Sequence, residues 1–457
     1  MPVLHPPGVW PPGPSAGLTG WGLLRHMSHD LLGTLAAWQR TFGDVVHLRI
    51  WPEHQLVVID PQLVRELLVG QHGALLRWER GMRVFAQLQG HSVFIAEGEA
   101  WRGKRHALQQ CFSPKAVQNF APAIARKTQQ ALAAWPTGAR NWPIESALTS
   151  LTMDVIVRMV FSDDIGIESR AVEKAVRVAM EVASAELYWP ASWPHWVPWK
   201  GVKRQALATL NGLIDGYLQA RLTLPQQTRP DDLLTRLLLL HHDDATAWPL
   251  HAVRDECMAI FLAGHETVAA TLTWWTWCMA DNPAAQTVAR EEVRRVLQGR
   301  APDAHDLPAL PYLTQTLQET MRLYPAAPVL NSRRSTRLIT LGSWQLPART
   351  LFIVPVQLMH HDPRWFPDPM AFHPERFGPE APAFARGAYL PFGTGPRVCL
   401  GQHLAMTEMV VIAAMVLQRF SLSVPDEMTA PRPVFHISLR PQQLVHLQVS
   451  PAQPSAF

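Results

Sequence analysis

The sequence predicts a mainly α-helical protein with small β-sheets, because a helical hydrophobic period covers most of residues 61–325. Residues 43–60 and 432–449 instead carry the β-branched runs that are typical of hairpins. No internal repeat and no linker divides the 457 residues. We therefore expect a Pro-rich lead-in over residues 1–20 and a single domain over residues 21–457.

Composition excludes several classes of protein. Charged residues make up only 17% and hydrophobic residues 47%, which favours a large core and argues against a disordered or nucleic-acid-binding chain. The net charge of +4 is a mild basic bias that is compatible with docking an acidic protein partner. The sequence has no run of 18 apolar residues and no signal-peptide pattern, so we expect a cytoplasmic protein without a transmembrane anchor.

The longest helix is predicted from about Leu250 to Ala280. Its residues are apolar on all sides, which is typical of a helix buried in the centre of a protein. Asn282 is expected to cap the next helix, and Pro283 to take the first position of that helix.

The chain changes character after Pro325. From there the expected elements are a small sheet over residues 340–356, Pro- and Phe-rich loops over 361–395, a final long helix over 400–420, and the hairpin over 432–449.

The most specific motif is FGTGPRVCLG over residues 392–401, which delivers Cys399 to the start of a helix. Its glycines allow a tight turn and a close approach to a flat ligand. The unpaired N–H groups at a helix start favour a thiolate, and Arg397 can meet an anionic group. The alternative is a structural cysteine buried at a helix start.

Glu319 and Arg322 have the i,i+3 spacing that places both side chains on one face of a helix. An exposed pair of this kind contributes little to stability. In an apolar neighbourhood the pair would need further partners, and Arg376 is a candidate for one of them.

The middle of the long predicted helix contains Ala263, Gly264, Glu266 and Thr267. Glycine inside a helix costs about 1 kcal/mol relative to alanine, so a close approach by another group is expected there. Glu266 and Thr267 could pass protons or hold water. The alternative for Thr267 is a hydrogen bond from its hydroxyl to a carbonyl of the preceding turn.

Together these motifs resemble the cytochrome P450 superfamily, and the resemblance covers roughly residues 20–450. The haem signature F-x-x-G-x-R-x-C-x-G is matched at Phe392, Gly395, Arg397, Cys399 and Gly401. Three further family motifs, E-x-x-R, A-G-x-E-T and W-x-x-x-R, are matched by Glu319 with Arg322, by Ala263 to Thr267, and by Trp101 with Arg105.

The resemblance implies the cytochrome P450 fold, a buried haem b (iron protoporphyrin IX), and insertion of one oxygen atom from O2 into an organic substrate. Cys399 would be the iron ligand, and Glu266 and Thr267 would govern proton delivery. Glu319, Arg322 and Arg376 would form a structural network. The implied cofactor-binding residues are Trp101, Arg105, Ala263, Arg333 (or its neighbour Arg334), Phe392, Arg397, Cys399 and Gly401.

The substrate is expected to be a mostly apolar small molecule. The Trp-rich segment 186–200 is interpreted as a lid over the substrate channel, as a patch that contacts a membrane or partner, or as local packing. The expected pocket residues are Met82, Phe85, Leu88, Ile260, Ala263, Val329 and Leu330.

Electrons are expected from a separate ferredoxin or flavodoxin-type donor with its NAD(P)H reductase, because the resemblance uses nearly the whole chain. Arg102 and Lys104 are candidates for the docking face of this carrier. Competing interpretations are a peroxide-driven or isomerising haem-thiolate enzyme and a non-catalytic haem sensor. A zinc site at residues 241–244, against a polar loop, is a further alternative.

Overall fold

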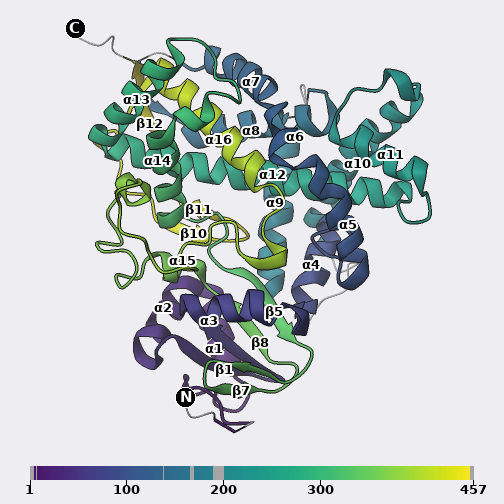
Figure 1. Cartoon of the computed structure of the whole chain (residues 1–457), viewed down its shortest axis with the longest axis vertical. Helices are drawn as coiled ribbons and strands as arrows, with labels where there is room; N and C mark the ends of the chain where they lie inside the picture. Colours follow the sequence, from purple (N-terminus) through teal and green to yellow (C-terminus); the bar gives the residue numbers. More distant parts are fainter. Residues whose placement is uncertain (1–4, 7, 137, 165–168, 189–199, 453–457) are drawn as a thin grey trace.

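The computed structural model describes residues 5–6, 8–136, 138–164, 169–188 and 200–452. Helices fill the larger part of the molecule, and a β-sheet lies at one end, next to the N-terminus (Figure 1). This arrangement confirms the predicted mainly α class with small sheets. The α-helices are α1 (Trp21–His29), α2 (Leu31–Phe42), α3 (Pro61–Arg65), α4 (Glu79–Gln89), α5 (Gly98–Cys111), α6 (Pro114–Gln118), α7 (Ala121–Ala133), α8 (Ile144–Phe161), α9 (Ser169–Tyr188), α10 (Gly201–Thr223), α11 (Leu233–Asp243), α12 (Leu250–Asp281), α13 (Pro283–Leu297), α14 (Pro311–Leu323), α15 (Val356–His360) and α16 (Gln402–Arg419).

The largest sheet has five strands in the order β1-β2-β8-β5-β3. β1 and β2 form the hairpin predicted over residues 43–60, with register pairs from Val45↔Val58 to Ile50↔Glu53. β2 runs parallel to β8, and the other neighbours are antiparallel. The strands are β1 (Val45–Ile50), β2 (Glu53–Val58), β3 (Leu75–Arg77), β5 (Leu330–Ser335) and β8 (Leu351–Val354).

Three smaller sheets complete the β structure. The hairpin predicted over residues 432–449 is only partly correct, because β10 and β11 pair but the following strand, β12, leaves them. β12 lies instead between β4 and β9, so this part of the chain closes a sheet with distant segments. The remaining strands are β4 (Ala139–Trp142), β6 (Ile339–Leu341), β7 (Trp344–Leu346), β9 (Phe420–Ser423), β10 (Pro433–Phe435), β11 (Leu439–Pro441) and β12 (Leu447–Pro451).

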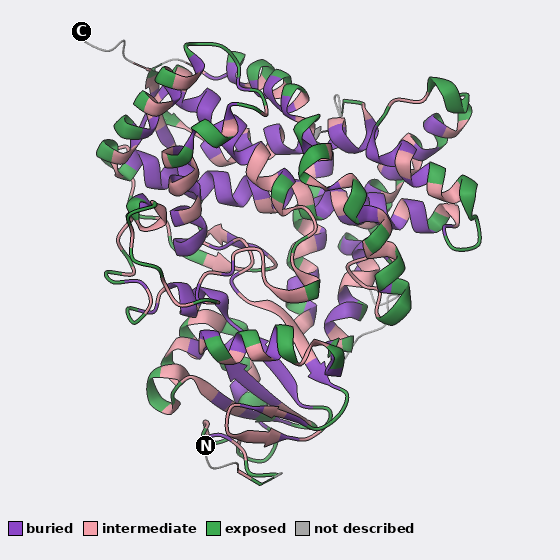
Figure 2. Ribbon diagram, viewed as in Figure 1, coloured by how far each residue is buried: buried purple, intermediate pink, exposed green. Residues whose placement is uncertain are grey.

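The central helix is α12, whose 32 residues cover the range that the sequence predicts. It is buried along most of its length (Figure 2) because other helices surround it. A Cβ atom on Gly264 would lie 2.7 Å from Cδ1 of Ile156 in α8. A larger residue here would force the Ile156 side chain to shift, so the glycine accommodates the expected close approach of α8 and α12.

The capping prediction for α13 is half correct. Pro283 takes the first position of the helix, as expected. The Asn282 side chain does not cap α13; its amide donates instead to the Cys278 carbonyl at the end of α12, at 2.8 Å. Capping of α13 would use the Asn282 Oδ1 as an acceptor, whereas the observed bond uses the Nδ2 donor and satisfies a free carbonyl at the end of α12.

The described residues of the lead-in contact the large sheet, since the His47 N–H of β1 donates to the Pro12 carbonyl at 3.0 Å. Within the ranges given above, none of the helices has the length and apolar character that crossing a bilayer requires. The division into a lead-in and one domain stays a prediction.

Candidate active site

A cavity of about 650 Å³ lies between the large sheet and α12. This volume falls within the usual range for small-molecule sites. The seven residues expected to line a substrate pocket all face this cavity: Met82, Phe85, Leu88, Ile260, Ala263, Val329 and Leu330. The residues expected to bind a cofactor also line it: Trp101, Arg105, Arg333, Phe392, Arg397, Cys399 and Gly401. Groups that are scattered along the sequence therefore meet at one site.

The loop that carries Cys399 is closed by its own backbone. The Cys399 N–H donates to the Phe392 carbonyl at 2.9 Å. Gly393 and Gly395 have φ angles of 73° and 75°, which L side chains rarely adopt. A Cβ atom on Gly395 would lie 2.5 Å from the carbonyl oxygen of Leu68, so this position has no room for a side chain. The glycines thus set the turn that directs Cys399 into the cavity.

The Cys399 side chain has a large accessible area because it faces the cavity, although the cavity itself lies inside the protein. Burial raises the pKa of the Cys399 thiol, while the Gly401 N–H and the positive charge of Arg105 lower it. Cys399 lies three residues before α16, which starts at Gln402. Gly401 is the N-cap residue of α16, so the start of this helix supplies the N–H group that bonds to the sulfur.

Two basic side chains, Arg105 and Arg397, hydrogen-bond at the loop that carries Cys399. Arg105 Nη1 donates to the Val398 carbonyl at 2.8 Å and so ties α5 to the loop. Arg397 donates to the Ala96 carbonyl at 3.0 Å, and its guanidinium carbon lies 3.8 Å from the ring centroid of Trp101. This cation–π contact joins Trp101 of α5 to the loop that carries Cys399.

The alternation of side chains along β5 places Arg333 and Arg334 on opposite faces of the strand. Arg333 lines the cavity, whereas Arg334 does not. Arg334 lies on the opposite face of the strand, where it forms ion pairs with Glu53 and Glu79. Successive side chains of a strand point to opposite faces. Arg333 is therefore the arginine available to a ligand.

The middle of α12 faces the cavity. Ala263 is exposed although it lies in the most buried helix, and the surface it exposes is part of the cavity wall. The Thr267 hydroxyl donates to the Ala263 carbonyl at 2.8 Å, so the expected hydrogen bond to the preceding turn is present. Its oxygen keeps lone pairs for a donor in the cavity.

Glu266 is held by Ser438 and Arg440, a segment that no sequence pattern pairs with it. Its Oε1 accepts a hydrogen bond from the Ser438 hydroxyl at 2.7 Å and lies 3.2 Å from Arg440 Nη2. Its Oε2 is buried and has no hydrogen-bond partner among the described residues. Glu266 and Thr267 both line the cavity, so an acid and an alcohol stand side by side on its wall.

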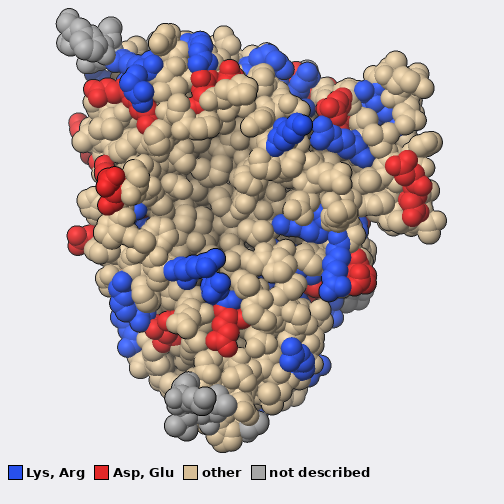
Figure 3. All heavy atoms as spheres, in the orientation of Figure 1, with Lys and Arg blue, Asp and Glu red and all other residues tan. Residues whose placement is uncertain are grey.

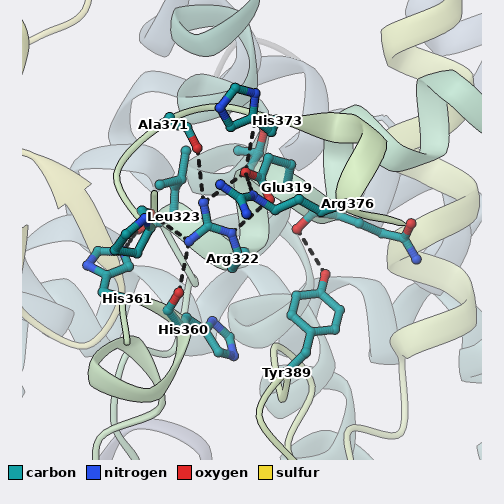
Figure 4. A network of polar contacts seen from close by, with 12 residues as sticks. Glu319, Arg322, Leu323, His360, His361, Ala371, His373, Arg376 and Tyr389 are labelled. Carbon is teal, nitrogen blue, oxygen red and sulfur yellow. Dashed lines mark hydrogen bonds and ion pairs between the residues drawn. The ribbon is translucent and has the colours of Figure 1, made fainter. Parts of the chain in front are cut away.

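Glu319 and Arg322 are fully buried and form a bidentate ion pair, with both N···O distances at 2.8 Å (Figure 4). The guanidinium also donates to the carbonyls of His360 and Ala371, at 2.8 and 3.1 Å. The pair is therefore the buried kind, which needs additional hydrogen bonds, and not the exposed kind.

The Glu319 carboxylate receives two further hydrogen bonds. The His373 N–H donates to it at 2.9 Å and Arg376 Nε at 3.2 Å, so the three expected members of the network are in contact. Nearby, the Tyr389 hydroxyl donates to the Gln318 carbonyl at 3.0 Å. Helix α14 is thereby joined to the loops that lead to Cys399.

The expectation that Lys104 belongs to a docking face is wrong. Lys104 Nζ lies 2.6 Å from Glu256 Oε1, and its side chain is only 16% exposed. The same carboxylate accepts the Val93 N–H at 2.9 Å. Lys104 therefore satisfies a buried acid between α5 and α12. Arg102, by contrast, is 67% exposed.

Several polar residues of the cavity region were not predicted from the sequence. Among them are Arg77, which lines the cavity, and Ser438 and Arg440, which hold Glu266. Arg77 ends β3, whose sequence Leu75-Leu76-Arg77 shows no polar–apolar alternation, so no sequence pattern indicated an inward-facing arginine. Nothing in the sequence pairs residues 438–440 with Glu266.

The structure bears differently on the zinc site and on the Trp-rich lid that the sequence suggested. Residues 241–244 lie at the end of α11, and none of the residues in the described ranges forms a cluster of three or more metal ligands. The proposed lid depends on Trp189, Trp193, Trp196 and Trp199, which lie outside the described residues.

Comparison with known proteins identifies the class to which this site belongs. The family model for cytochrome P450 matches residues 11–449, so the chain belongs to the cytochrome P450 family. Cyclooctat-9-en-7-ol 5-monooxygenase of Streptomyces melanosporofaciens is 32% identical over 86% of this chain and 88% of its own length. Cyclooctatin synthase of the same organism is 30% identical over 88% of both chains. Cytokinin hydroxylase of Arabidopsis thaliana is 28% identical over 93% of this chain and 85% of its own.

Membership makes this chain an oxidoreductase of the monooxygenase class, with a haem-iron cofactor. The residues present fit such a group. Cys399 offers a thiolate ligand inside the cavity, and Arg77, with two buried nitrogens that lack partners among the described residues, lines the same cavity as Arg333 and Arg397. Cationic donors of this kind match the carboxylates that a haem carries.

The buried pair generates a prediction about stability. Glu319→Ala should lower the free energy of unfolding by roughly 3–5 kcal/mol, because Arg322 would remain buried without its partner. Urea unfolding followed by circular dichroism measures this change, and the purified variant should carry less haem. Glu99→Ala, which breaks an exposed pair with Arg102, is the matched control and should change stability by less than about 1 kcal/mol. Equal effects of the two substitutions would contradict the structural role.

The position of Cys399 generates a prediction about the ligand. Cys399→Ser should abolish the red-shifted absorption band of the reduced, CO-bound protein, since that band reports a thiolate bound to iron. Cys111→Ser is the control, because Cys111 does not line the cavity and the substitution should leave the band intact. Survival of the band in Cys399→Ser would rule out Cys399 as the ligand.

Proposed function

We propose that this protein inserts one oxygen atom from O2 into a mostly apolar small molecule, with electrons supplied by a separate redox partner. The observation that carries the proposal is the make-up of one cavity. Cys399 and a basic cluster lie at its base, apolar side chains form its walls, and Glu266 with Thr267 interrupts those walls on α12.

The cofactor would be haem b, held by Cys399 and by contacts that are not covalent. The sequence has no C-x-x-C-H motif, which attachment as a c-type haem would require. When bound, the haem supplies the redox chemistry that activates O2. Trp101, Arg105, Arg333 and Arg397 would hold its carboxylates, and Ala263, Phe392 and Gly401 would lie against it.

Glu266 and Thr267 would control protons at the cavity wall. The Thr267 oxygen can accept a hydrogen bond from a donor in the cavity while its own proton is shared with the Ala263 carbonyl. Glu266 is fixed by Ser438 and Arg440, and its free Oε2 is the atom that could take up or release a proton. The pair would therefore guide protons to one position above Cys399.

Loss of the Thr267 hydroxyl should uncouple the reaction. Thr267→Ala should keep cofactor and substrate binding but divert most reducing equivalents to peroxide, since general acid–base assistance contributes roughly 10²–10⁴-fold. The measurement is the ratio of product and peroxide to NAD(P)H consumed, with a generic ferredoxin and its reductase.

Two variants make this test specific. Thr267→Ser restores a hydroxyl and should recover most of the coupling. Thr271→Ala removes a hydroxyl that bonds the preceding turn in the same way, at 2.9 Å to the Thr267 carbonyl, and should stay coupled. Unchanged coupling in Thr267→Ala would contradict the proposed role.

The substrate would be compact and largely apolar. The seven lining residues expected from the sequence are all apolar, and each 100 Å² of apolar surface that they bury contributes about 2.5 kcal/mol. The Streptomyces relative is named for oxygenating cyclooctat-9-en-7-ol, which supports a substrate of this class.

A ligand panel tests this substrate class. Cyclic hydrocarbon alcohols should shift the haem from low spin to high spin, whereas the sulfate esters of the same alcohols should bind at least about tenfold more weakly. Titration followed by absorption spectroscopy gives both affinities. The proposed substrate class would be wrong if only the charged esters produced the shift.

The electron donor would be a ferredoxin or flavodoxin-type protein that docks near Cys399. The face formed by α5, α16 and the Cys399 loop has a centre of mostly uncharged side chains, with Lys and Arg atoms next to it and Asp and Glu atoms among them toward the edges (Figure 3). Such a face attracts an acidic protein over a distance, and salt weakens that attraction. The expected cytoplasmic location also stays a prediction.

Charge reversal tests the docking face. Arg102→Glu should slow the first electron transfer from an acidic ferredoxin several-fold at low salt, and the difference from wild type should shrink as ionic strength rises. Arg170→Glu, an exposed substitution on α9, is the control for the change in net charge. Stopped-flow reduction under CO measures the rates. Equal rates for both variants, independent of salt, would exclude this docking face.

A further inference from the structure

The tip of the β10–β11 hairpin forms part of the cavity wall, because residues 435–438 all line the cavity. Two hydrogen bonds of Leu439, the next residue, fix the tip in place. The Leu439 N–H donates to the Ala326 carbonyl at 3.0 Å, and the Leu439 carbonyl accepts a hydrogen bond from Trp274 Nε1 at 3.0 Å. The tip is therefore held between α12, which contains Trp274, and the segment that follows α14.

The same tip contacts the acid–alcohol pair of α12. The Ser438 hydroxyl donates to Glu266 Oε1 at 2.7 Å, and Thr267 is the next residue of the helix. The segment after α14 supplies the neighbouring wall, and several of its cavity-lining side chains are apolar: Ala326, Ala327, Val329 and Leu330. The hairpin tip therefore lies between the Glu266–Thr267 pair and an apolar wall.

His436 is the polar side chain of the tip that the chain leaves without a partner. Phe435 and Ile437 need no hydrogen bond, and the Ser438 hydroxyl bonds to Glu266. The His436 N–H closes the turn by donating to the Ser438 carbonyl at 3.2 Å. Its imidazole ring is exposed at the cavity and has no hydrogen-bond partner among the described residues. The tip therefore presents a free imidazole to a molecule that enters the cavity.

A molecule that fills this part of the cavity removes water from the His436 ring. A neutral imidazole has one donor and one acceptor nitrogen, so it can pair with a hydroxyl group in either direction. A pure hydrocarbon would leave both nitrogens without a partner, and an unpaired buried polar group is costly. A site of this kind therefore discriminates against an analogue that lacks the hydroxyl.

We infer that His436 determines specificity by binding a hydroxyl group of an otherwise apolar substrate. The inference rests on the proposed function, because it names the polar group of the substrate class proposed there. The tip that carries His436 is attached to α12 through Ser438 and Glu266. A hydroxyl bound to His436 therefore sets how the rest of the substrate lies relative to Thr267, and so which carbon is oxidised.

Spin-state titration of two matched probes tests the inference. 1-Adamantanol and adamantane share one rigid cage and differ by a single hydroxyl group. Wild type should bind the alcohol more tightly, and His436→Phe should weaken binding of the alcohol roughly three- to tenfold. Binding of adamantane to His436→Phe should stay unchanged or become tighter, because a phenyl ring leaves no polar group unpaired. His436→Gln keeps a donor and an acceptor and should bind the alcohol with intermediate affinity.

Two control variants separate hydrogen bonding from packing. Phe435→Leu removes apolar area from the same tip and should weaken binding of both probes by a similar factor. His446→Phe makes the same chemical change at a histidine that does not line the cavity, and should bind both probes as wild type does. All variants are compared at equal amounts of CO-binding haem, so that a variant that folds poorly does not distort the measured affinities.

The distribution of products gives a second readout that a packing role would not move. With a generic ferredoxin and its reductase, 1-adamantanol can be oxidised at several positions of the cage. A hydroxyl held by His436 should direct oxidation to one position, so wild type should form one diol isomer as its main product. His436→Phe should form a mixture of isomers, while total turnover at saturating substrate changes less than the isomer ratio.

Four results would overturn the inference. Equal weakening of both probes by His436→Phe would assign His436 a packing role, and unchanged affinity for the alcohol would assign it no role in binding. A spectral change of opposite sign that the alcohol still produces in His436→Phe would mean that the hydroxyl binds iron instead. A changed absorption spectrum of ligand-free His436→Phe would mean that His436 itself binds iron.

Failure of the proposed function has a different signature. Wild type would then lack the thiolate band or oxygenate neither probe. Failure of this inference alone would leave wild type active on both probes, with affinities and products that do not depend on His436.

Discussion

The position of the Cys399 loop depends on the buried ion pair between Glu319 and Arg322. Arg322 holds the carbonyl of His360, and the His360 ring accepts the N–H of Leu390 at 2.9 Å. The Leu390 carbonyl accepts the Gly393 N–H at the start of the Cys399 turn. Hydrogen bonds through His360 and Leu390 therefore connect α14 to Gly393, at the start of the turn that carries Cys399. Because a buried charge without a partner is costly, this series fixes the loop more firmly than apolar packing alone would.

Charged side chains around the cavity differ in whether other residues of the chain neutralise them. Where charged side chains face the interior away from the cavity, the chain supplies the counter-charge, as Glu256 does for Lys104 and as Glu53 and Glu79 do for Arg334. Where they face the cavity, compensation by the chain is incomplete. This difference separates side chains that stabilise the fold from side chains that are available to a ligand.

The sequence predicted the central helix, the first hairpin and part of the cavity lining, because each depends on local periodicity or on a motif of a few residues. Apart from the contact of Arg376 with Glu319, it did not predict the contacts between distant segments described above. Glu256 is 152 positions away from Lys104, and Ser438 is 172 positions away from Glu266, so no local pattern reports either contact. The side chain of Asn282 illustrates a different limit. This side chain could have hydrogen-bonded to the end of α12 or to the start of α13, and the geometry of the turn favours the end of α12.

The cavity also links the protein to the metabolic state of its cell. A domain is stable by only about 5–15 kcal/mol, and a ligand that binds the folded chain at about 1,000 times its Kd adds about 4 kcal/mol. The walls around Cys399 come from the sheet, from α4, α5 and α12, and from the loop itself. Cofactor binding therefore bridges parts of the chain that are synthesised far apart in time. The abundance of this protein should follow the supply of haem. Chains without haem are less stable, so a larger fraction of them is unfolded and open to proteolysis.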